Sequence, residues 1–244
     1  MTAYIVVGSV AALIAAMAQS CIGFGFSMIL APALLLVLDA KSVVPTVLLV
    51  DIFNCLLVSI RYREHILPRI VIPLAIGGVI GFAAGIRFLF HGDQHSLRLA
   101  MGIFVLVFTV LQWRGWRRPI REKLYTLLPV GFLSGLAGGA SSMSGPPVVL
   151  FMANQDHNPH VFRASLISYF TFIEVYGIAL FWWSGALTHE IIVNAAVLIP
   201  AMLFGSIMGF FLASHFPEHI FKKMILFLLF VIGIFLTLSA ALPR

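Results

Sequence analysis

The sequence predicts an all-α protein that crosses a membrane several times. Of its 244 residues, 61% are hydrophobic and only 10% are charged, and the mean hydropathy is +1.07. A soluble domain carries about 25% charged residues to cover its surface, so this composition excludes a soluble fold. Because about 20 residues span the hydrocarbon core, the chain is long enough for about eight to ten crossings and leaves no separate soluble domain.

Eight apolar segments follow one another along the chain, separated by short polar breaks. All four tryptophans lie at segment ends, where aromatic side chains meet lipid headgroups. The second to fourth and the sixth to eighth segments each have the length of one transmembrane helix. The first and fifth are longer and carry Gly, Ser and Pro in their interiors, so each is predicted to be a broken or re-entrant helical hairpin. The segments are 3–38, 42–60, 70–90, 97–113, 124–154, 161–183, 190–213 and 221–242.

The two long segments divide the chain into similar halves. Setting Gly23 on Gly138 aligns the long segments, and after a short shift Gly77 and Gly205 begin the same Gly-x-x-x-Gly pattern. A unit repeated in this way indicates a duplicated architecture. We therefore expect a single membrane-embedded domain made of an N-terminal repeat (1–113), a basic cytoplasmic linker (114–123) and a C-terminal repeat (124–244).

The positive charges indicate how the halves are oriented. If each long segment is a hairpin, one side of the membrane holds 11 of the 15 Lys and Arg residues, whereas single crossings would place nine on that side. Cytoplasmic loops are rich in Lys and Arg, so the hairpin is favoured, with inverted repeats and both termini outside. Inverted repeats around discontinuous helices are typical of secondary transporters. This clustering in loops also explains the net charge of +6 without a nucleic-acid partner.

Both long segments carry residues suited to holding a small ligand. Irregular backbone at membrane depth is tolerated only where protein or a water-filled cavity satisfies it, and the N-terminus of a half-helix presents N–H groups with a partial positive charge. Two such ends are predicted to bind an anion, because no Lys or Arg lies deep in any segment and serine hydroxyls add donors. The candidate binding residues are Gln19, Ser20, Gly23, Gly25, Ser27, Pro32, Gly138, Gly139, Ser141, Ser142, Ser144, Gly145 and Pro146.

Small residues have an alternative role, which is to let helices pack closely in the membrane. This alternative stays open for the two broken segments. We expect close packing to account for five other glycines that recur at four-residue intervals, namely Gly77, Gly81, Gly85, Gly205 and Gly209.

Two acidic residues lie near the middle of apolar segments, Asp51 in 42–60 and Glu174 in 161–183. Ionisable groups within the hydrocarbon are costly and are therefore functional candidates. We expect one of them to take up and release a proton during transport, because burial favours the neutral carboxyl form; a purely structural, hydrogen-bonded acid is the alternative. Neighbouring polar residues that could line the pathway are Asn54, Tyr169 and Thr171. Cys21 and Cys55 are expected to be small buried side chains, without a disulfide or a metal.

The broken segments resemble the duplicated motif of the TauE/SafE family of sulfite and organosulfonate exporters. The resemblance rests on Gly23-Phe-Gly25 with Pro32, and on Gly131-x-x-x-Gly135-x-x-Gly138-Gly139 with Pro146-Pro147. It covers nearly the whole chain, and it implies a prokaryotic plasma-membrane permease for small sulfur-containing anions. The serines at 27, 141, 142 and 144 replace glycines that are frequent in the family pattern.

The sequence therefore predicts a secondary transporter of small anions, with an exporter of sulfite- or sulfonate-type anions implied by the resemblance. An anion channel and an accessory subunit of a larger complex remain the alternatives. An enzyme is not expected, since no Ser-His-Asp set, HExxH motif or pair of midplane aspartates is present. A primary pump is not expected either, since the sequence has no phosphate-binding glycine loop. No cofactor or metal is predicted. The expected partners are a small anionic solute, the lipid bilayer and a second copy of the chain.

Overall fold

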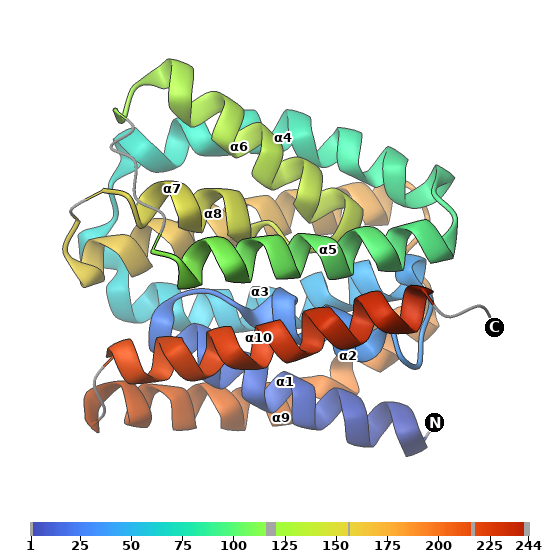
Figure 1. Ribbon diagram of the computed structural model, residues 1–244. Coiled ribbons are helices and arrows are strands. Elements are labelled where there is room, and N and C mark those ends of the chain that lie inside the picture. Colours follow the sequence, from blue (N-terminus) through green and yellow to red (C-terminus); the bar gives the residue numbers. More distant parts are fainter. Residues whose placement is uncertain (1, 116–120, 156, 216–217, 242–244) are drawn as a thin grey trace.

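In the computed structural model, the described residues (2–115, 121–155, 157–215 and 218–241) form a bundle of helices (Figure 1). The predicted all-α fold is confirmed for this part of the chain. The helices are α1 (Thr2–Ile22), α2 (Phe26–Leu34), α3 (Ala40–Tyr62), the short 3-10 helix η1 (Arg63–His65), α4 (Pro68–His91), α5 (Gln94–Trp113), α6 (Leu124–Ser141), α7 (Gly145–Met152), α8 (Pro159–Trp183), α9 (His189–His215) and α10 (Glu218–Ala241).

The long helices have the length and composition of membrane spans. Within the described residues, seven helices are long and apolar enough to cross a bilayer, and α10 contains a further apolar stretch, Lys223–Ser239. Large apolar side chains such as Ile80, Phe211 and Trp183 are exposed on the outside of the bundle. Since such side chains are stable against lipid and not against water, the protein is a multi-pass membrane protein.

Both long apolar segments are broken, as predicted. The first is interrupted at residues 23–25 between α1 and α2, and the fifth at residues 142–144 between α6 and α7. The first break needs left-handed backbone at Gly23 (φ 86°) and Gly25 (φ 105°), which glycine adopts without a steric penalty. In each case the short helix turns back beside the long one (Figure 1). Each long segment is therefore a hairpin with a helix that starts inside the bundle.

Each half contributes its first helix to the other half. Helix α1 packs most extensively against α9, and α6 against α4, while α3 pairs with α8 and α5 with α10. These pairs map onto one another when the halves are exchanged. In Figure 1, α1 and α6 run in opposite directions across the bundle, and the start of α1 lies at the end of the bundle opposite to the start of α6. The inverted repeat stays a prediction, and these pairings are the arrangement it would produce.

Glycines set the close approach of these exchanged helices. A Cβ atom at Gly81 would collide with the carbonyl oxygen of Phe132 in α6, and one at Gly205 with that of Leu13 in α1. One helical turn further on, Gly85 meets α6 and Gly209 meets α1 in the same way. The expected packing role of these glycines agrees with these contacts.

The helix bounds change the alignment of the two halves. Gly25 and Ser144 are the N-caps of α2 and α7, whereas Gly138 lies inside α6, so the predicted correspondence was one helical turn out of register. Helices α4 and α9 end at His91 and His215, which sets Gly205 on Gly81. The glycine contacts fit both registers, because Gly205 against Leu13 matches Gly81 against Phe132 as well as Gly77 against Leu128.

Candidate functional site

A small polar pocket lies where the two short helices begin. It has about 10 Å³ accessible to the centre of a water molecule, which is room for about one water. Two larger grooves of about 490 and 420 Å³ on the outer surface are lined almost wholly by apolar side chains, as expected for a surface that faces lipid. The polar pocket is therefore the candidate site. Its lining residues are Gln19, Gly25, Phe26, Ser27, Met28, Asp51, Ser144, Gly145, Phe170 and Glu174.

The N-terminus of α2 forms one wall of the pocket. The first hydrogen bond of this helix runs from the N–H of Ile29 to the carbonyl of Gly25 at 3.1 Å, so the amides of the three residues between them precede the intrahelical pattern. Gly25 caps the helix without a side chain that would cover these amides. The positive end of the helix dipole therefore faces the pocket, together with the Ser27 hydroxyl group.

The start of α7 is poorer in donors than the start of α2. Gly145 is its first residue, and Pro146 and Pro147 follow. Proline has no backbone N–H, so two of the first three amides that a helix normally offers are missing. The sequence predicted two equivalent anion-binding ends. In this fold, α7 contributes a favourable dipole but few hydrogen bonds, and α2 supplies the larger number of donors.

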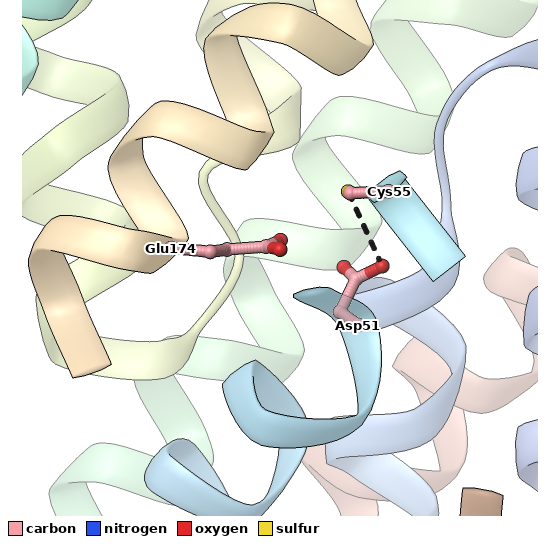
Figure 2. Close-up of side chains that lie close together, drawn as sticks. All are labelled: Asp51, Cys55 and Glu174. Atoms are coloured by element: carbon pink, nitrogen blue, oxygen red, sulfur yellow. Dashed lines mark hydrogen bonds between the residues drawn. The ribbon is translucent and has the colours of Figure 1, made fainter. Parts of the chain in front are cut away.

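Two acids from different halves meet beside these helix ends. Asp51 and Cys55 lie one turn apart on α3 and face Glu174 of α8 (Figure 2). Their ligand atoms all lie within 4.8 Å of one another, and all three side chains are at most 4% exposed. Two carboxyl groups this close, in a site that bulk water does not fill, cannot both be charged at low cost. The pair therefore holds at least one proton between them.

Cys55 takes part in a chain of polar side chains and is not merely a small buried residue. Its thiol donates to Asp51 Oδ1 at 3.7 Å and accepts from Gln19 Nε2 at 3.2 Å. Asn54 Nδ2 donates to Gln19 Oε1 at 2.9 Å, and Ser206 Oγ donates to Asn54 Oδ1 at 2.5 Å. This chain joins α9, α1 and α3 to the acidic pair. The sequence missed Cys55 and Ser206, although Cys55 follows Asp51 by one helical turn on the same face.

The structure brings together seven of the predicted site residues. Gln19, Gly25, Ser27, Ser144 and Gly145 line the pocket with the two acids. Asn54 does not line the pocket, but its side chain donates a hydrogen bond to Gln19, which does.

Other predicted residues lie outside the pocket lining. Gly138 and Gly139 pack against Phe82 of α4, and Pro32 lies inside α2. Ser20 approaches α9 at Gly209. The remaining residues bond elsewhere or lie apart from the pocket: Ser141 and Thr171 donate to carbonyls within their own helices, Ser142 donates to Ser141, Tyr169 donates to Ser134, Gly23 contacts Arg163, and Pro146 lies in α7.

Arg163 lies closer to the site than the sequence suggested. It lies in the first turns of α8, is 8% exposed, and has side-chain carbons against Gly23 at the α1–α2 break. No Lys or Arg is among the residues that line the pocket, and Arg163 lies near the start of α8, so both findings agree with the prediction that no Lys or Arg lies deep in a segment. A buried guanidinium beside the break adds positive potential near the N-terminus of α2.

The donor set of the acidic cluster also resembles that of a metal site. A tetrahedral zinc shell, with bonds of about 2.0–2.3 Å, would bring its ligand atoms to about 3.3–3.8 Å from one another. Since the three atoms here are spread over up to 4.8 Å, the cluster would have to contract to hold such an ion.

The match with known proteins covers both hairpins and the pocket. Residues 9–236 match the protein family described as Sulfite exporter TauE/SafE. The chain is a member of the TauE/SafE family. Over 198 residues it is 26% identical to a Cupriavidus necator protein named "Probable sulfite/organosulfonate exporter TauE", and the similarity covers 78% of this chain and 77% of that protein. No solved structure matches the chain.

Membership in the TauE/SafE family confirms the resemblance found in the sequence. The matched region begins inside α1 and ends inside α10, so every residue that lines the pocket lies within it. TauE/SafE proteins are membrane transport proteins, which agrees with the multi-pass fold.

Proposed function

We propose that this TauE/SafE protein is a secondary transporter that exports small anions of the sulfite or sulfonate type, and that the pocket at the start of α2 is its substrate site. The observation that carries the proposal is the meeting of a helix N-terminus and two carboxyl groups in one enclosed polar pocket. Helix N-termini favour anions, and the family and its C. necator relative supply the chemical class.

The two acids give the transport its coupling. An anion next to Asp51 and Glu174 is repelled most strongly when both are charged and less strongly when one of them takes up a proton. Binding of the anion and binding of protons therefore favour each other, and by linkage each strengthens the other. An anion carried with a proton moves outward only when its own outward gradient exceeds the opposing proton gradient. A metabolite that accumulates inside the cell meets that condition.

The size of the pocket supports a carrier over an open channel. Room for about one water molecule is too little for an oxyanion with several heavy atoms, so the helix starts must separate to admit it. Carriers expose a central site to one side at a time. The protein would lie in the plasma membrane, with the linker 114–123 in the cytoplasm, as the positive charges favour.

Transport by the purified protein in liposomes tests the proposal. Vesicles that contain the protein and are loaded with sulfite or methanesulfonate should release the anion faster than loaded vesicles without the protein. An imposed pH gradient should drive accumulation of the anion. A channel would release the anion but would not accumulate it against its gradient. Failure to move either anion under any gradient would reject the proposed function.

A further inference from the structure

Asp51 and Glu174 have different hydrogen-bonding surroundings, although both carboxyl groups face the same pocket. Asp51 Oδ1 accepts a hydrogen bond from the Cys55 thiol at 3.7 Å. Glu174 also lies within hydrogen-bonding reach of Asp51 and Cys55, but its Oε2 is buried and has no hydrogen-bond partner among the described residues. Figure 2 shows Glu174 pointing from α8 toward Asp51 and Cys55, which lie beside each other on α3. The two acids are therefore expected to hold a proton with different affinities.

The hydrogen bonds that lead to Asp51 all run in one direction. Ser206 donates to Asn54, Asn54 to Gln19, Gln19 to Cys55, and Cys55 to Asp51. The last hydrogen bond of this series ends on Asp51 Oδ1, which must act as the acceptor. An ionised carboxyl group is purely an acceptor, whereas a protonated one also has a hydrogen to place, so this arrangement stabilises the charged form of Asp51.

The unpartnered oxygen of Glu174 points to the opposite state. A buried oxygen without a hydrogen bond costs more when it carries charge than when it belongs to a neutral group. Glu174 is 3% exposed, so solvent does not offset that cost. The proton that the two acids share is therefore held by Glu174.

We propose that Glu174 is the proton-binding site of this transporter, and that Cys55 is the positioning residue that keeps Asp51 ionised beside it. This inference deepens the proposed function and rests on it. The step is a proton transfer alone: the O–H bond of Glu174 breaks and the proton passes to water admitted when the pocket opens. The reverse transfer restores the bond when the pocket opens on the other side.

The surroundings of Glu174 contain few other groups that titrate. Helix α3 presents Asp51 and Cys55. Helix α4 faces this level of α8 with Gly78 and Phe82, and α7 faces it with Gly145, none of which titrates. The short helix η1 meets α8 only near its start, where the ring of His65 lies 5.4 Å from that of His160.

Infrared spectroscopy of the purified protein reads the protonation state directly, without transport. A protonated carboxyl group has a carbonyl stretch separate from those of carboxylates and amides. At neutral pH the wild type should show this band, Glu174→Gln should lose it, and Asp51→Asn should keep it. Loss of the band in Asp51→Asn with retention in Glu174→Gln, or its absence from the wild type, would overturn the assignment.

Coupling in liposomes separates failure of this inference from failure of the proposed function. With sulfite as the probe and a pH-sensitive dye inside, wild type should move protons together with sulfite. For each sulfite that it moves, Glu174→Gln should carry about tenfold fewer protons than wild type, or fewer still. If wild type moves no sulfite, the proposed function fails. If Glu174→Gln moves sulfite and protons as before, only the present inference fails.

Cys55 is tested through the midpoint pH at which a second carboxyl band appears, because this band forms when Asp51 takes up a proton of its own. Cys55→Ser keeps a donor for Asp51 and should titrate as the wild type does. Cys55→Val removes the donor at similar volume, destabilises the charge on Asp51, and should move the midpoint to higher pH. A purely structural role for Cys55 would leave the midpoint unchanged in every variant that folds, and that result would remove Cys55 from the proposal.

Discussion

Asp51 of α3 and Glu174 of α8 come from different halves of the chain, yet a carboxyl oxygen of each lies within 4.8 Å of the other in the pocket where α2 and α7 begin. Helices α3 and α8 pair across the centre of the bundle, so any change in their packing alters the distance between the two acids. A proton that neutralises one acid also relieves the repulsion between these helices. The chemistry of the pocket is thereby tied to the arrangement of the two halves.

Anion binding should strengthen as the pH falls. Methanesulfonate keeps its single negative charge over the whole working range, so a change in its affinity reports the protein and not the ligand. Protonation of the acids removes repulsion, and affinity should rise about tenfold for each proton taken up per pH unit. Calorimetric titration between mildly acidic and mildly alkaline pH measures this slope. An affinity that does not depend on pH would contradict a protonation-dependent pocket.

Ser27 and Ser141 form a matched pair of serines for testing the helix start. Ser27 lines the pocket, whereas the Ser141 hydroxyl donates to the Ala137 carbonyl inside α6 at 2.7 Å. Ser27→Ala should weaken sulfite binding by about 0.5–1.5 kcal/mol, which is about two- to tenfold. Ser141→Ala should leave binding unchanged. Equal effects of the two substitutions in a thermal-shift titration would argue against a substrate site at α2.

Gly81 and Gly205 should be intolerant of any side chain. Gly81 lies against a carbonyl oxygen of α6, and Gly205 lies against a carbonyl oxygen of α1. The backbone of these helices is rigid and cannot move aside to make room for a methyl group. Gly81→Ala and Gly205→Ala should each cost about 1–3 kcal/mol of folding free energy through overpacking. Gly8→Ala is the control, because its new methyl group meets the end of the flexible Leu198 side chain. Thermal unfolding in detergent compares the three variants, and a Gly8→Ala loss as large as the others would remove the backbone-contact explanation.

Ser206 should matter for stability as well as for the pocket. Ser206→Ala leaves the buried Asn54 Oδ1 without its donor, and an unsatisfied buried polar atom costs about 1–3 kcal/mol. Ser214, which is exposed near the end of α9 and donates to the carbonyl of Phe211, serves as the control position. Ser206→Ala should lower the unfolding temperature, and Ser214→Ala should not. If both variants had similar unfolding temperatures, the hydrogen bond from Ser206 to Asn54 would contribute little to folding stability.

Thiol labelling in cells tests the orientation in the membrane. Both native cysteines are buried, so the background reaction should be low. Glu64 and Ser184 are exposed, and they lie near opposite ends of α8, since η1 with Glu64 meets the start of α8 and Ser184 caps its end. An impermeant maleimide should label Ser184→Cys in intact cells and Glu64→Cys only after permeabilisation. The opposite pattern would place the linker outside and the chain termini in the cytoplasm.

The sequence by itself determined the all-α membrane fold, the number of long apolar segments and the two breaks. These features depend on local composition, because a bilayer demands about 20 apolar residues per crossing and clusters of Gly, Ser and Pro interrupt a helix wherever they occur. Asp51 and Glu174 could be found in the same way, since a charge within an apolar segment is conspicuous. The sequence also carried the family motif.

Only the tertiary structure decided how these parts meet. The alignment of the halves depended on where the helices begin and end, as the N-caps Gly25 and Ser144 show. The roles of Cys55 and Ser206 required side chains from α1, α3 and α9 to come together. Contacts of this kind join residues that are far apart in the chain, and no local pattern of hydrophobicity specifies them. The apolar pattern fixes which segments enter the membrane, and side-chain packing fixes which polar atoms share a pocket.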